Sequence, residues 1–125
     1  MIGCAAGLPD MDPSSPFKFE YIGMVGSADF NYSELDNINK ALDRSNVRHQ
    51  LVVFEGKHDW PPADIMEQAF LWIELNAMKD NVAAANDSII KSAVVWFDSQ
   101  ISQLKKENKY FELHECYKQV VNYLD

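Results

Sequence analysis

Two side chains that together could perform acid–base chemistry each follow an apolar stretch of the sequence. Asp29 lies in GSADFNYSE, after the stretch 19–27, and His58 lies in FEGKHDWPP, after the apolar residues 51–54. A carboxylate held against an imidazole fixes the tautomer of the ring and stabilises the imidazolium, which is the supporting half of a serine-type triad. Asp29 and His58 are therefore the candidate catalytic residues.

Each candidate also has a plainer interpretation. Asp29 can be a turn residue near a helix start, where backbone amides and the helix dipole favour an acid, and His58 can be an ordinary loop histidine. Trp60, two positions after His58, is a candidate substrate-binding residue. The alternative for Trp60 is an aromatic ring that seals the start of the next helix against the sheet.

The elements around these residues predict how the two candidates meet. A short strand at 1–7 is followed by a strand at 19–27, a helix at 31–46 and a strand in the stretch 48–56, whose run 51–54 is typical of strands buried on both faces. A strand–helix–strand crossover makes two parallel neighbours and brings their carboxyl ends to one edge of the sheet. Ligands usually bind at that edge in open α/β sheets.

Local signals refine this prediction. Asn31 and Glu34 have the spacing of a capping box at the start of the helix 31–46. Gly23 and Gly26, inside the second strand, indicate places where other atoms pack closely on the backbone. The segment LPDMDPSSP, residues 8–16, has three prolines and is predicted to be a loop.

The rest of the chain has a helical pattern. Pro61 and Pro62 suit the first turn of a helix, and the apolar face that follows is formed by Ile65, Ala69, Phe70, Trp72 and Ile73. Two further helices are expected, one from Asn86 to Lys106 and one from Lys109. The fold class is thus α/β, with a partial parallel sheet of about three strands at 1–80 and a C-terminal helical hairpin at 81–125.

Composition excludes some functions. The formal charge of −8 argues against nucleic acid as a partner, because that affinity comes mainly from lysine and arginine. No segment is long enough to span a membrane. Cys4 and Cys116 lie too far apart in the sequence for a zinc site and are interpreted as packing residues, so neither a metal nor another cofactor is expected.

The stretches GSADFNYSE and FEGKHDWPP, followed by a helix, resemble the C-terminal half of an α/β-hydrolase of the dienelactone-hydrolase and esterase branch. The resemblance covers residues 1–79. It implies a small ester or acyl substrate, with Asp29 and His58 as the triad acid and histidine. The sequence departs from the family at the nucleophile, since GCAAG has the glycine spacing of an elbow but Ala5 at its centre. We therefore expect the nucleophile to lie in a preceding segment and this chain alone to be inactive.

The tail LKKENKYFELHECYKQVVNYLD resembles the second half of a tetratricopeptide-type repeat. It motivates a second hypothesis, a non-catalytic binding or scaffolding module that acts through residues 86–125. A partial sheet also exposes strand edges and apolar faces, so self-association through a sheet edge or the helices is expected. The sequence gives no prediction of the cellular compartment.

Overall fold

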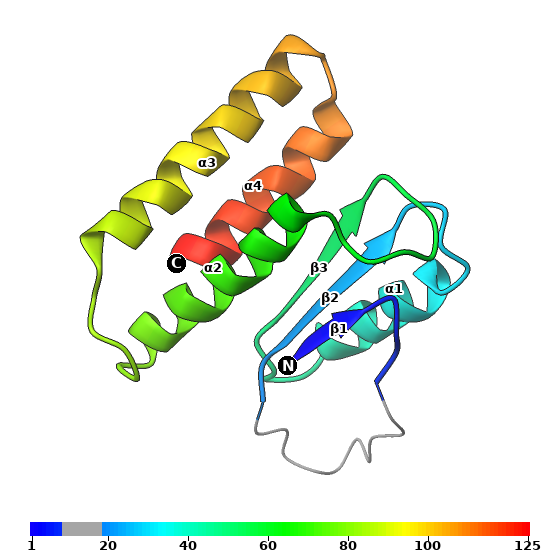
Figure 1. The fold of residues 1–125 in the computed structure, drawn as a ribbon, viewed down its shortest axis with the longest axis horizontal. Coiled ribbons are helices and arrows are strands. Elements are labelled where there is room, and N and C mark those ends of the chain that lie inside the picture. Colours follow the sequence, from blue (N-terminus) through cyan, green and yellow to red (C-terminus); the bar gives the residue numbers. More distant parts are fainter. Residues whose placement is uncertain (9–18) are drawn as a thin grey trace. The chain divides into compact units, whose positions relative to one another are not determined.

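Three strands and one helix come first in the described chain, and the elements after the third strand are all helices (Figure 1). The description rests on a computed structural model and covers residues 1–8 and 19–125, so most of the loop predicted at 8–16 lies outside it. The elements are β1 (Ile2–Cys4), β2 (Tyr21–Gly26), α1 (Tyr32–Leu42), β3 (His49–Phe54), α2 (Ala63–Lys79), α3 (Asp87–Lys106) and α4 (Tyr110–Leu124). They pack as two compact units, residues 1–69 and 70–125, and the division between the units lies inside α2.

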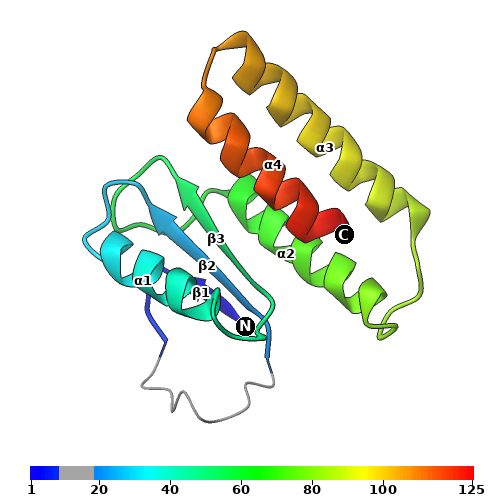
Figure 2. The same ribbon diagram turned by 180° about the vertical axis from the view of Figure 1, so that it is seen from behind.

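The first unit is built on a parallel three-stranded sheet. Its order is β1-β2-β3, with Ile2 paired to Ile22 and Gly26 to Phe54. Every residue of the central strand β2 is buried. Helix α1 contacts β2 and β3 and lies along one face of the sheet (Figure 2). The predicted α/β class and the parallel pairing of the strands are confirmed.

Strand β3 differs from the prediction of burial on both faces. Val52 and Phe54 are buried, whereas Val53 between them is 44% exposed. Successive side chains of a strand point to opposite faces, so one face of β3 remains open to solvent near its carboxyl end.

The capping box predicted at Asn31 and Glu34 is wrong. Asn31 is the N-cap residue of α1, but its side chain makes no capping hydrogen bond. Its own backbone is already helical, with φ −84° and ψ 0°, whereas a capping side chain needs an extended residue to reach the next amides. The Asn31 side chain instead donates from Nδ2 to the carbonyl oxygen of Ala5, 2.7 Å away.

The prolines and the apolar face of α2 also differ from prediction. The helix begins at Ala63, so Pro61 and Pro62 precede its first residue. Ala69 and Trp72 are fully buried as expected, but Phe70 is 55% exposed.

The second unit contains the end of α2 together with α3 and α4. Trp72 donates from Nε1 to Oδ1 of Asn122, 3.4 Å away. The rings of Phe97 on α3 and Tyr123 on α4 meet edge to face, with centroids 5.1 Å apart. Helix α3 begins where the sequence predicts, and the Asn86 side chain caps it by accepting hydrogen bonds from two backbone amides of the first turn. Among the described helices, none has both the length and the apolar composition that crossing a bilayer requires.

Candidate active site at the carboxyl edge of the sheet

Asp29 and His58 lie on two loops that leave the same edge of the sheet. Asp29 follows the end of β2 by three residues, and His58 follows the end of β3 by four. The two strands are parallel and in register at their last residues, Gly26 and Phe54. The loops therefore begin side by side, as the sequence predicts.

The two side chains are in hydrogen-bonding contact. Nδ1 of His58 lies 3.1 Å from Oδ1 and 3.2 Å from Oδ2 of Asp29. The Asp29 side chain is completely buried, whereas that of His58 is 46% exposed. A buried carboxylate on Nδ1 favours the Nδ1–H tautomer, in which Nε2 carries a lone pair. Within residues 1–8 and 19–125, no group hydrogen-bonds to Nε2.

Asp29 also serves as a turn residue, so its plainer interpretation holds together with the contact to His58. Its Oδ1 accepts a hydrogen bond of 2.7 Å from the backbone amide of Asn31. Its backbone amide donates to the carbonyl of Gly26, and its carbonyl accepts from Tyr32. These bonds hold the carboxylate at the start of α1 before any contact with the imidazole is considered.

The loop that carries His58 is held against the end of β2 by close backbone packing. A Cβ placed on Gly26 would lie 2.6 Å from the carbonyl oxygen of Gly56 and would also overlap the Lys57 carbonyl. The Gly56 carbonyl accepts a 2.8 Å hydrogen bond from Ala28, one residue before Asp29. The close approach predicted at Gly26 is thus confirmed, and it positions the histidine loop beside the aspartate loop.

Gly23 is also confirmed as a place of close packing, but it acts farther from the site. A Cβ on Gly23 would lie 2.9 Å from the hydroxyl oxygen of Tyr21, the buried tyrosine at the start of β2. The absence of a side chain at Gly23 therefore leaves room for the Tyr21 ring along the central strand.

Phe30 is a site residue that the sequence analysis missed. Its ring stacks on the imidazole of His58, with centroids 4.3 Å apart and planes inclined by 29°. The side chain is nevertheless 75% exposed. The signal in the sequence was the position of an aromatic residue directly after Asp29, between the predicted strand and the predicted helix.

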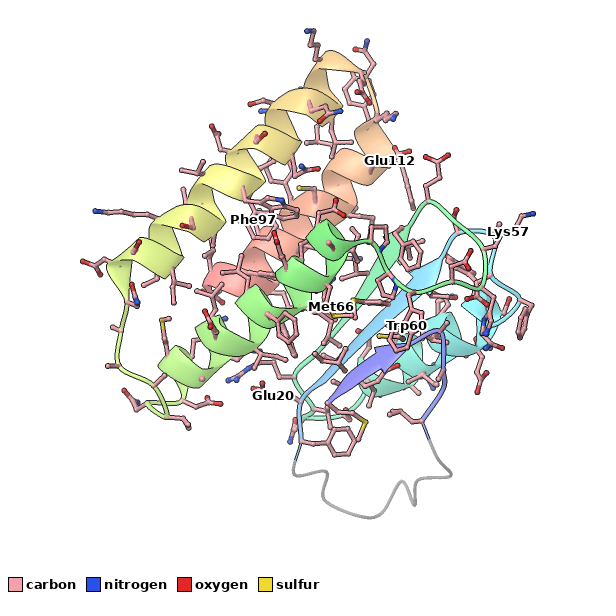
Figure 3. The ribbon with its side chains drawn as sticks, in the orientation of Figure 1. Glu20, Lys57, Trp60, Met66, Phe97 and Glu112 are labelled. Carbon is pink, nitrogen blue, oxygen red and sulfur yellow. The ribbon has the colours of Figure 1, made fainter. Side chains whose placement is uncertain are left out.

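Trp60 lies on the loop that joins β3 to α2, as does Lys57 (Figure 3). Trp60 is 80% exposed, so it does not seal the helix start against the sheet. An exposed indole near His58 remains compatible with substrate binding. That role stays a prediction.

The turn after β1 reaches the same edge. The backbone amide of Ala5 donates to the carbonyl oxygen of Met24, and the carbonyl oxygen of Ala5 accepts from the side-chain amide of Asn31. Ala5 has φ 49°, the left-handed conformation, but carries no nucleophilic atom. The neighbouring Cys4 is half-buried, and this burial raises the pKa of its thiol, which disfavours the reactive thiolate.

The described residues, 1–8 and 19–125, contain no group of three or more His, Cys, Asp or Glu side chains arranged to hold a metal ion. Comparison of the chain with protein-family models, with curated proteins and with solved structures found no match.

Proposed function

We propose that this chain supplies the acid and the histidine of a serine-type acyl hydrolase whose substrate is a small ester or related acyl compound. The observation that supports this most directly is the contact of the buried Asp29 carboxylate with Nδ1 of His58, at the carboxyl edge of a parallel sheet. That contact directs the basic Nε2 of the exposed imidazole away from the carboxylate.

In this proposal His58 acts as general base and then as general acid. Nε2 takes the proton from a serine or cysteine nucleophile while the nucleophile attacks the acyl carbon, and it returns the proton to the departing alcohol. In the second half-reaction Nε2 takes a proton from water, which attacks the acyl-enzyme and releases the acid. Asp29 keeps its charge throughout and stabilises the imidazolium.

The nucleophile and the oxyanion donors are proposed to come from polypeptide outside these 125 residues, as in the C-terminal half of an α/β-hydrolase. The sequence contains no Gly-x-Ser-x-Gly. Ala5 stands at the centre of the one stretch that has the elbow's glycine spacing.

The test of this function has two parts. The chain alone, incubated with an activated ester at neutral pH, is expected to show no more turnover than the same concentration of free imidazole. In a longer protein that carries the chain together with a Gly-x-Ser-x-Gly segment, His58→Ala is expected to abolish turnover, and His114→Ala, at an exposed histidine on α4, is the matched control. Full activity of the longer protein with His58→Ala would eliminate the assignment.

A second candidate function is a binding or scaffolding module that acts through the C-terminal helices, including a tail of tetratricopeptide type. It is supported by large apolar side chains that α3 and α4 expose: Val94, Val95, Phe111, Tyr117 and Val121. The two candidates are distinguished by the gene sequence upstream of this segment. If that reading frame lacks a Gly-x-Ser-x-Gly, the binding function is the better proposal.

Self-association of the chain is part of both candidates. Among residues 1–8 and 19–125 the edge strands of the sheet are β1 and β3, and Val53 of β3 is partly exposed. We expect a homodimer or larger assembly by light scattering coupled to size-exclusion chromatography. A monomer across the micromolar range would contradict this expectation.

A further inference from the structure

The contact of Phe30 with His58 differs from the ring pairs in the second unit. Two other ring pairs, Trp96–Phe97 and Phe97–Tyr123, meet edge to face and include the buried Phe97. Phe30 and His58 instead lie nearly face to face, with both side chains substantially exposed. The packing of a core therefore does not account for this pair.

The exposure of Phe30 also limits what its aromatic ring can contribute to folding. A side chain that is 75% exposed removes little apolar surface from water, so hydrophobic burial gives no reason for a large aromatic residue here. The ring does lie within stacking distance of the imidazole, and offset stacking is a favourable arrangement of two planar rings. The specific interaction of Phe30 is thus with His58.

The hydrogen bond from His58 to Asp29 leaves one motion of the imidazole unrestrained. It holds Nδ1 at the carboxylate, but the ring can still rotate about that hydrogen bond through coupled changes of its two side-chain torsions, the terminal one of which has broad energy wells. A planar partner against the face of the ring restricts that rotation. The carboxylate and the phenyl ring together define both the edge and the plane of the imidazole, and so the direction of Nε2.

We propose that Phe30 is a positioning residue, which holds the imidazole plane of His58 so that Nε2 points in one direction while Nδ1 stays on Asp29. This inference rests on the proposed function for its catalytic meaning. The reacting atoms of an acyl transfer must be aligned to within a fraction of an ångström, so a fixed Nε2 direction is what a general base requires.

The test measures the mobility of the His58 ring by ¹³C relaxation in the whole chain. Histidine ring signals come from His49, His58 and His114, and a His58→Ala variant identifies those of His58. In the unchanged chain we expect a rigid ring, with an order parameter of about 0.85, and cross-relaxation between the Phe30 and His58 ring protons. Phe30→Leu is expected to lower the order parameter below about 0.6, and Phe30→Tyr to restore it.

Two results would overturn the proposal. One is a rigid His58 ring in Phe30→Leu, with far-UV circular dichroism showing a folded chain. The other is the absence of cross-relaxation between the two rings in the unchanged chain, a measurement that needs no variant to fold. Neither result bears on the Asp29–His58 contact, because that contact is tested separately by the tautomer of His58, which ¹⁵N shifts report. If the unchanged chain does not show the Nδ1–H tautomer, that result counts against the proposed function.

Discussion

Replacing Gly26 by alanine tests whether close backbone packing brings the two site loops together. The new Cβ would lie 2.6 Å from the Gly56 carbonyl oxygen and 2.8 Å from its carbon, whereas ordinary contact begins at 3.4 Å. The Gly56 carbonyl must therefore withdraw by at least about 0.8 Å (3.4 − 2.6), and the Lys57 carbonyl, which overlaps the new Cβ more closely, by more. If His58 moves with it away from Asp29, the Nδ1–Oδ1 distance grows from 3.1 Å to about 3.9 Å (3.1 + 0.8), beyond hydrogen-bonding range.

We expect Gly26→Ala to lower the free energy of unfolding by about 1–3 kcal/mol, the usual cost of forcing extra atoms into a packed region. Urea denaturation measures this loss. The ¹⁵N shifts of the His58 ring should show that the Nδ1–H tautomer no longer predominates.

The matched control is Gly56→Ala. Its Cβ would meet only the Phe54 ring, at 3.2 and 3.4 Å, and a side chain can yield by a few tenths of an ångström. Both variants reduce the flexibility of the unfolded chain equally, so the difference between them isolates the overlap at Gly26. Equal stability and an unchanged His58 tautomer in Gly26→Ala would refute the reasoning.

Two further predictions concern the second unit and an exposed control. Trp72→Ala is expected to lower the free energy of unfolding in urea by about 3–5 kcal/mol, because the ring is fully buried, whereas Trp60→Ala should change it by less than about 0.5 kcal/mol. Similar losses for the two tryptophans would show that the burial pattern is wrong. Burial raises the pKa of the Tyr123 phenol, so the folded state holds this proton more tightly and stability should fall as the pH rises above about 10. Tyr123→Phe should make that fall in the urea midpoint shallower, and an identical pH profile in both proteins would contradict the assignment.

The meeting of Asp29 and His58 could be predicted because it follows from local signals and a general rule. Apolar runs mark β2 and β3, the helical pattern of α1 separates them, and the crossover makes the strands parallel. The extent of α3, expected from Asn86 to Lys106 and found at Asp87–Lys106, was predictable for the same reason, since its helical pattern is local.

The features that could not be predicted depend on neighbours far away in the sequence. Asn31 has the right type for a cap, but the turn built by Asp29 places its side chain on Ala5, 26 positions earlier. The exposure of Val53 depends on what covers the sheet face around β3, and the apolar run that contains it carries no information about that cover. The stack of Phe30 on His58 requires two side-chain rotations that no periodicity encodes.

Whether Asp29 prepares His58 as a base is tested most directly by the ¹⁵N spectrum of the His58 ring, recorded at a pH where the ring is neutral, in the unchanged chain and in Asp29→Asn. The asparagine can keep its oxygen on the Asn31 amide and place its amide nitrogen where Oδ2 lies, 3.2 Å from Nδ1. It would then donate to Nδ1 and force the proton to Nε2. We predict the Nδ1–H tautomer in the unchanged chain and the Nε2–H tautomer in the variant. The same tautomer in both proteins would contradict the proposal that Asp29 prepares His58 as a base.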